Sequence, residues 1–148
     1  ETIRHHRLLE TYLAEALGYE WHEVHDEAET LEHHISEDFE ERIAELLGHP
    51  THDPHGDPIP DRDGVIPADL GLPLTAWNEG DVLRITRITD QRGEVLRFLD
   101  EHGIIPGNEV KILAKAPFSG PITLEQGGEP VTISTDLAEQ IQVASRDA

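Results

Sequence analysis

Apolar residues recur at helical spacing through the first third of the chain. Between residues 9 and 17 they stand at i, i+3, i+4, i+7 and i+8, which predicts one buried helix face, and Gly18 follows as a stop signal. A second amphipathic stripe predicts a helix over residues 20–34. Ser36 is a good N-cap and predicts a third helix that ends at Gly48. Three short helices with narrow apolar faces make a thin core, so we expect self-association to cover what they leave exposed.

The second half has short apolar runs separated by turn residues, a pattern typical of β-strands. Strands are expected at 81–89, 109–114, 121–125, 130–134 and 141–144. Short helical segments are expected at 94–101 and 136–140. The run Gln126-Gly127-Gly128-Glu129 between two of the strands is typical of a hairpin turn. Several short strands in so brief a stretch suggest a small open barrel, and the fold class is therefore α+β.

Prolines separate the two halves. They recur from residue 50 to residue 73, where they remove backbone donors and block helix formation. We interpret this stretch as an extended connector. The expected organisation is a helical domain at 1–66, a linker at 67–77 and a barrel at 78–148.

The composition favours two small units over one large core. Only 36% of the 148 residues are apolar and 5% are aromatic. No apolar run approaches the roughly 20 residues that a membrane span requires. No signal peptide is evident, so we expect a soluble, cytoplasmic protein without a membrane partner. Cysteine is absent, which excludes thiolate metal ligands. Methionine is absent too, and the chain opens directly in helical sequence, so we expect a fragment whose upstream part is missing.

The formal net charge of −20 limits the possible partners. Such a surface repels phosphate backbones, so we expect no DNA binding by this chain alone. Solubility or a halophilic origin would explain the charge, and so would attraction of divalent cations. Histidine placement helps to separate these interpretations, because nine of the ten histidines precede residue 56.

Potential metal ligands gather on the first two predicted helices. Four of them fall within an arc of roughly 100° beside the apolar stripe of the second helix. These four are His25, Glu29, Glu32 and His33. On the preceding helix, His6 and Glu10 lie at i and i+4. A carboxylate at the edge of a core is costly without a partner, and a divalent cation would supply one. Two antiparallel helices could thus present six ligands to one cleft, although an acidic surface also groups carboxylates by chance.

Catalytic machinery is not evident. The chain has no H-E-x-x-H motif of zinc hydrolases and no E-x-x-H motif of di-iron bundles. It also lacks a glycine-rich phosphate loop and a cysteine nucleophile. We therefore expect a protein that is not an enzyme.

Three stretches carry a resemblance to a known family. They are His5-His6-Arg7-Leu8-Leu9-Glu10, then Val24-His25-Asp26-Glu27-Ala28-Glu29 with Glu32-His33, then Gly56-Asp57-Pro58-Ile59-Pro60. Together they resemble the dimerisation domain of diphtheria-toxin-repressor-type regulators, and the second half is similar to the SH3-like, FeoA-like barrel that ends many of them. The resemblance implies the metal-sensing, homodimer-forming portion of a manganese- or iron-dependent transcriptional repressor that controls metal homeostasis. Operator DNA would be contacted only through an N-terminal winged helix-turn-helix domain that this chain lacks.

The resemblance also implies roles for individual residues. Glu29, Glu32 and His33 match the family's primary metal site, which ligands from the missing N-terminal part complete. The iron-responsive branch has cysteine at the position of Glu29, whereas the manganese-responsive branch has glutamate. A hard carboxylate suits Mn(II), with Fe(II) as the other possible ion. His6 matches a histidine of the primary site in manganese-type members and of the ancillary site in iron-type ones. Glu10 and His25 match ancillary ligands.

The connector supplies a weaker set of candidates. Asp53-Pro54-His55-Gly56 resembles the C-P-H-G segment of manganese-responsive members, in which the cysteine and histidine join a second site with a barrel carboxylate. Here Asp53 stands where the cysteine would be, and Asp90 is the candidate for the carboxylate. The alternative for His55 is an exposed turn residue.

Two functions from other classes stay open. A dimeric structural interaction module would carry the same histidines and acids as ordinary surface residues and would bind no metal specifically. A metal-dependent hydrolase would require an open coordination position and a nearby base.

Overall fold

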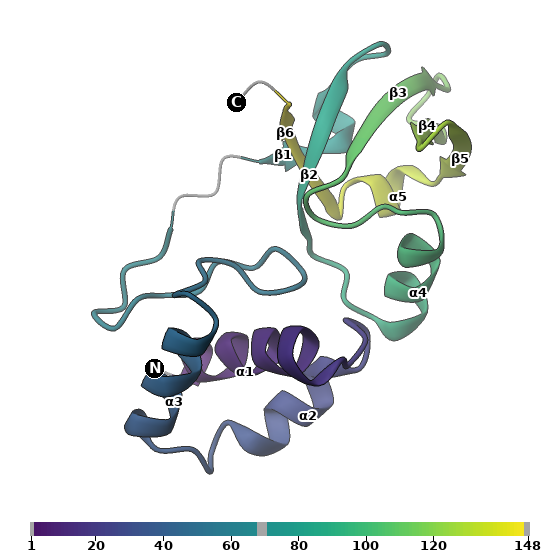
Figure 1. Ribbon diagram of the computed structural model, residues 1–148. Helices are drawn as coiled ribbons and strands as arrows, with labels where there is room; N and C mark the ends of the chain where they lie inside the picture. Colours follow the sequence, from purple (N-terminus) through teal and green to yellow (C-terminus); the bar gives the residue numbers. More distant parts are fainter. Residues whose placement is uncertain (1, 68–70, 147–148) are drawn as a thin grey trace. The chain divides into compact units, whose positions relative to one another are not determined.

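The computed structural model describes residues 2–67 and 71–146 (Figure 1). The chain divides into two compact units, Glu1–Asp69 and Leu70–Ala148. Within the described residues, no helix has the length and apolar character needed to cross a membrane.

Three helices build the first unit. They are α1 (Thr2–Leu17), α2 (Val24–Leu31) and α3 (Glu37–Leu46). The first of them, α1, packs against both of the others. Leu9 and Leu13 of α1 meet Val24, Ala28 and Ile43 in one buried cluster. The helical spacing therefore identified the buried face as far as Leu13, whereas Leu17 at the end of the predicted stripe is 56% exposed.

The helix ends follow local chemistry. Gly18 adopts a positive φ of 76° directly after α1, where the Tyr19 N–H donates to the Leu13 carbonyl at 3.0 Å. Ser36 caps α3 by accepting a hydrogen bond from the Phe39 N–H at 3.1 Å. The second helix is shorter than the predicted range 20–34. The Glu23 carboxylate accepts from the Glu20 N–H at 3.0 Å and closes a turn there, so α2 begins only at Val24.

The proline-rich stretch after α3 differs from an extended connector. Most of residues 53–60 are buried on the first unit. One carboxylate oxygen of Asp53 accepts from the backbone N–H groups of His55 and Asp57, both at 2.9 Å, and folds the chain into a tight turn. Ile59 then packs with Leu8 and Ala44. Prolines prevent a helix here but not burial, which explains why composition alone pointed to a linker.

The second unit is an antiparallel sheet with two small helices. Its strands are β1 (Leu72–Pro73), β2 (Val82–Ile88), β3 (Glu109–Lys115), β4 (Ile122–Gln126), β5 (Glu129–Ile133) and β6 (Ile141–Ser145). The sheet order is β1-β6-β2-β3-β4-β5. The helices are α4 (Gly93–Glu101) and α5 (Thr135–Ala138), with a 3-10 turn η1 (Leu74–Ala76). The predicted α+β class and the small β-domain are confirmed.

Details of this unit agree with the turn signals, with one addition. Gly127 and Gly128 both have positive φ, 60° and 85°, in the two-residue turn that pairs β4 with β5. The addition is β1, a two-residue strand that pairs with β6 inside the range expected to be a linker. Leu74 follows it and is fully buried. Pairing with a strand far along the chain, rather than a local pattern, makes this segment part of the sheet.

Candidate metal centre

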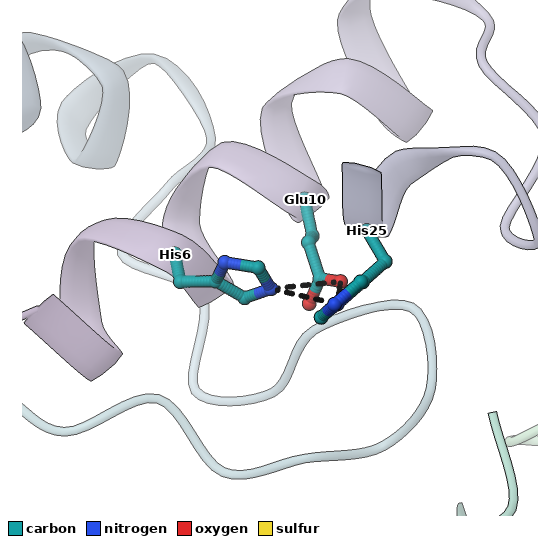
Figure 2. Close-up of side chains that lie close together, drawn as sticks. All are labelled: His6, Glu10 and His25. Atoms are coloured by element: carbon teal, nitrogen blue, oxygen red, sulfur yellow. Dashed lines mark hydrogen bonds and ion pairs between the residues drawn. The ribbon is translucent and has the colours of Figure 1, made fainter. Parts of the chain in front are cut away.

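The first donor cluster joins α1 to the start of α2, and we call it the outer cluster (Figure 2). It consists of His6 and Glu10, on successive turns of α1, and His25. His6 Nε2 lies 3.3 Å from Glu10 Oε2 and 3.2 Å from His25 Nδ1, and Glu10 Oε2 lies 3.8 Å from His25 Nδ1. Ligands held at about 2.0–2.6 Å from one cation are separated by distances of this size. The three atoms therefore fit one cation without rearrangement of the backbone.

Burial gives Glu10 its importance in this cluster. Its side chain is only 1% exposed. This burial raises the pKa of Glu10, although the neighbouring His6 works in the opposite direction. The contact with Glu10 in turn raises the pKa of His6, against the effect of its own burial. In the absence of a cation the cluster therefore tends to retain protons, which a divalent ion would displace.

A second cluster lies on the other side of Glu10, and we call it the inner cluster. It contains Glu10, Asp53 and His55, all buried. His55 Nδ1 is 3.8 Å from Glu10 Oε1 and 3.9 Å from Asp53 Oδ1. On its opposite side, His55 Nε2 donates to the Trp21 carbonyl at 2.7 Å. In the neutral ring that bond places the proton on Nε2 and leaves the Nδ1 lone pair for a ligand, the usual arrangement of a metal-binding histidine.

Buried polar atoms of this centre lack hydrogen-bond partners. Among the described residues, the buried atoms without a hydrogen-bond partner include Glu10 Oε2, Asp53 Oδ2 and His55 Nδ1. Such atoms are uncommon because each one loses its hydration without compensation. A divalent cation is a partner that two carboxylates and an imidazole can share. The donor set, oxygen and nitrogen without sulfur, thus fits Mn(II) or Fe(II).

Opposing effects set the protonation of the inner cluster. Burial alone would raise the pKa of Asp53, but His55 and Glu10 outweigh it and lower that pKa. Burial would lower the pKa of His55, but Asp53 and Glu10 outweigh it and raise that pKa. The two carboxylates thus favour the protonated form of His55 over the neutral form.

Three predicted ligands of the first unit lie outside the two clusters around Glu10. They are Glu29, Glu32 and His33. Glu32 is bonded to His6 Nδ1 at 3.0 Å, which is the ring nitrogen opposite to the one facing Glu10. His33 lies 3.4 Å from Glu32, and Glu29 lies 3.7 Å from His25. We expected six donors around one cleft. The structure instead connects them pairwise, because one nitrogen of His6 faces Glu10 and the other faces Glu32.

Asp90 is the last of the predicted ligands and belongs to the second unit. It follows β2, and its two carboxylate oxygens accept hydrogen bonds from the Arg92 guanidinium at 2.9 and 2.7 Å. That guanidinium lowers the pKa of Asp90. The role of Asp90 as a metal ligand stays a prediction.

Sequence reasoning missed two features of this centre. The Trp21 carbonyl, which orients His55, is a backbone group and leaves no mark in the sequence. Asp26 forms a third, exposed group with His25 and Glu29, and neighbouring acids gave no reason to single it out. The signal for the inner cluster was the Asp-Pro-His-Gly run, whose first residue is a typical turn former.

Comparison with known proteins identifies both units. Residues 1–61 match the iron dependent repressor, metal binding and dimerisation domain, and residues 72–145 match the FeoA domain. The iron-dependent repressor IdeR of Mycobacterium tuberculosis is 31% identical over 157 residues, covering 95% of this chain and 66% of that protein. The diphtheria toxin repressor of Corynebacterium diphtheriae is 33% identical over 152 residues, covering 95% of this chain and 66% of that protein.

Solved structures agree. A manganese-dependent transcriptional repressor in complex with manganese superposes with a TM-score of 0.89 at 41% identity, covering 97% of this chain and 69% of that one. The IdeR of T. acidophilum gives a TM-score of 0.88 at 31% identity, covering 97% of this chain and 66% of that one. The class defined by a helical metal-binding domain followed by a FeoA domain is that of metal-dependent regulators. The chain belongs to the diphtheria-toxin-repressor-type family of metal-dependent transcriptional repressors.

Proposed function

We propose that this chain is the metal-sensing and dimer-forming portion of a repressor that responds to Mn(II), with Fe(II) as the other candidate ion. The observation that carries the proposal is the convergence of His6 and His25 on the buried carboxylate of Glu10. Burial without a partner would be costly for that carboxylate, and a divalent cation would remove the cost.

The choice of ion rests on ligand chemistry. Carboxylates and imidazoles without thiolate suit Mn(II) and Fe(II), whereas cysteine would favour softer metals. The solved relative at 41% identity is described as manganese-dependent, and the curated relatives near 31% identity as iron-dependent. The ligand chemistry admits both ions, and the higher identity to the manganese-dependent relative favours manganese.

The proposal also keeps the other predicted ligands. Glu29, Glu32 and His33 would hold part of a primary site that groups outside this chain complete. Asp53 and His55 would form a further site with Glu10, and Asp90 is the candidate ligand from the second unit. The polar contacts of Glu32 with His6 and His33 are consistent with a site completed by further ligands.

DNA control would follow from linkage. If the ion binds more tightly when a DNA-binding part is docked on the helices, then metal shifts the population toward that docked state. The net charge of −20 disfavours contact of residues 1–148 with operator DNA. Operator contacts would then be made in the cytoplasm by an N-terminal domain, as in the family that the chain resembles. In a two-fold dimer, docking would place two recognition helices about one DNA turn apart, roughly 34 Å.

Self-association is supported by exposed apolar side chains of the first unit. Phe39 and Leu46 of α3 are 47% and 68% exposed, and Ile3 of α1 is 53% exposed. Large apolar groups at the surface of a small helical unit favour a protein partner. A homodimer would bury them.

Calorimetric titration with Mn(II) tests the metal proposal. We expect specific binding by the wild type and strong loss of it in Glu10→Gln. The control is Glu15→Gln, an exposed carboxylate of the same helix, which should bind as the wild type does. Equal binding by all three proteins would contradict the proposal and favour a structural interaction module. Sedimentation of the wild type with and without Mn(II) would report the dimer separately.

A second experiment tests the choice of ion. Glu29→Cys should shift the preference toward Fe(II), Co(II) or Zn(II), because a thiolate is a softer ligand than a carboxylate. Competition titrations with these ions would measure the shift. An unchanged order of affinities would contradict the role given to Glu29.

A further inference from the structure

Glu10 belongs to both donor clusters, and each of its oxygens faces a different one. Oε2 lies 3.3 Å from His6 Nε2 and 3.8 Å from His25 Nδ1. Oε1 lies 3.8 Å from His55 Nδ1. A carboxylate that chelated a single ion would turn both oxygens toward the same set of partners. Here the two oxygens point to two sets.

Each of the two sides has donors of its own. The outer side has the imidazoles of His6 and His25. The inner side has His55 and Asp53, whose side chains are 1% and 0% exposed. Glu10 Oε2, Asp53 Oδ2 and His55 Nδ1 are buried without hydrogen-bond partners, so polar atoms that lack a partner occur on both sides of the carboxylate. One ion on either side would leave the other side unsatisfied.

The local charge favours cations on both sides of Glu10. Glu10 and Asp53 contribute two carboxylates directly. Glu32 contacts His6 at 3.0 Å, and Glu29 contacts His25 at 3.7 Å, which adds two more on the outer side. Glu10 and Asp53 therefore offset part of the charge of two divalent ions directly, and the two neighbouring carboxylates, which the proposed function also places at the primary site, add negative charge nearby.

We propose that the Glu10 carboxylate bridges two divalent cations, with Oε2 on an ion shared with His6 and His25 and Oε1 on an ion shared with Asp53 and His55. This inference rests on the proposed function, since both clusters must bind cations. The two clusters then form one dinuclear centre within the first unit, built from α1, α2 and the turn at residues 53–57.

The inner half is built to keep its geometry. The Trp21 carbonyl accepts from His55 Nε2 at 2.7 Å, and the two rings stack with centroids 5.8 Å apart. One carboxylate oxygen of Asp53, Oδ1, is fixed by the N–H groups of His55 and Asp57. Because backbone groups orient both side chains, the inner donors remain in place in the absence of an ion.

Electron paramagnetic resonance of the Mn(II)-loaded chain, combined with the number of ions bound per protomer, tests the bridge. Two Mn(II) ions joined by one carboxylate are magnetically coupled and give hyperfine lines at half the spacing of an isolated ion. We expect this coupled spectrum in the wild type and in the control Glu15→Gln. Glu10→Gln should bind two fewer ions per protomer and lose the coupled spectrum.

Two single-cluster variants complete the design. His25→Ala removes an outer donor that is 56% exposed, so the fold should tolerate it. Asp53→Asn keeps an oxygen that can accept from both backbone N–H groups while it removes the negative charge. Each should lose one ion per protomer and the coupled spectrum, while the other ion remains. Circular dichroism would verify that both variants are folded.

The possible failures are distinguishable. Isolated-ion spectra at full loading, or a loss of only one ion in Glu10→Gln, would overturn the bridge and leave the proposed metal-sensing function standing. Absence of specific Mn(II) binding by the wild type would overturn both.

Discussion

The two clusters that share Glu10 are built in different ways. The outer cluster depends on helix geometry: His6 and Glu10 are one turn apart on α1, and His25 is 56% exposed at the start of α2. The inner cluster depends on a buried turn, and its His55 and Asp53 are 1% and 0% exposed. An exposed donor costs little without an ion, whereas a buried one loses its hydration permanently. A cation should therefore affect the stability of the inner cluster more than that of the outer one.

Glu10→Gln should have the largest effect, because it removes the carboxylate that both clusters use. Wild-type chain at a Mn(II) concentration 100 times its Kd should gain about 2.7 kcal/mol of stability. The variant should lose this gain. Without metal its stability should change less, because burial, which raises the pKa of Glu10, disfavours the charged carboxylate, whereas its contacts with His6 and His55 favour it. Thermal unfolding with and without Mn(II) measures both effects, and a full metal-induced shift in the variant would contradict the prediction.

Asp53→Ala should destabilise the metal-free chain by about 1–3 kcal/mol, since two buried backbone N–H groups lose their acceptor. Asp53→Asn should cost less, because its amide oxygen can accept the same two bonds. Urea unfolding of the two variants separates the structural role of this side chain from its role as a charge. Equal losses in both would indicate that the turn does not depend on the Asp53 oxygen.

Raising the pH should weaken the metal-free first unit. The pKa values of His6 and His55 are raised above 6.5, so the folded state binds more protons than the unfolded state in the window above that value. Stability is therefore fully present below pH 6.5 and is lost as the pH rises through the raised values. We expect a loss on the order of 1 kcal/mol, comparable with the net contribution of one hydrogen bond.

Chemical unfolding from about pH 6 to pH 8 would follow this change across the range in which histidine titrates. His55→Gln should flatten the profile, whereas replacement of the exposed His33 should leave it unchanged. The Mn(II)-induced gain should rise over the same range, because the ion requires the deprotonated donors. A gain that fell with pH would contradict displacement of protons by metal.

The smallest effect on stability is expected for His25→Ala. The side chain is 56% exposed, so the metal-free variant should lie within about 0.5 kcal/mol of the wild type. Its Mn(II) affinity at the outer position should nevertheless fall by more than the roughly 10- to 100-fold that follows loss of a group supporting a ligand, because His25 is itself a proposed ligand. Calorimetry and unfolding on the same sample would measure the two together. A large loss of stability would mean that the outer cluster is as structural as the inner one.

Local sequence predicted most of the fold. The double-glycine turn at Gly127 and Gly128, the Ser36 cap and the stop at Gly18 each act through neighbouring backbone groups, and the structure has all three. The missed strand β1 illustrates the limit. It has two residues and exists because Leu72 and Pro73 pair with β6, far along the chain. A two-residue strand is too short to show an alternating pattern in the sequence, so it could not be predicted.

In the metal centre too, some features follow from local sequence and others only from long-range contacts. The order of residues was enough to define the ligand types, oxygen and nitrogen without sulfur, and the one-turn spacing that places His6 beside Glu10, because helix geometry is local. The position of Asp53 and His55 against the other oxygen of Glu10 depends on folding. Packing of Ile59 on Leu8 and Ala44 and the donation of Arg7 to the Pro58 carbonyl hold that proline-rich turn on α1. The Arg7–Pro58 bond joins residues 51 positions apart, so only the folded chain brings the donors together.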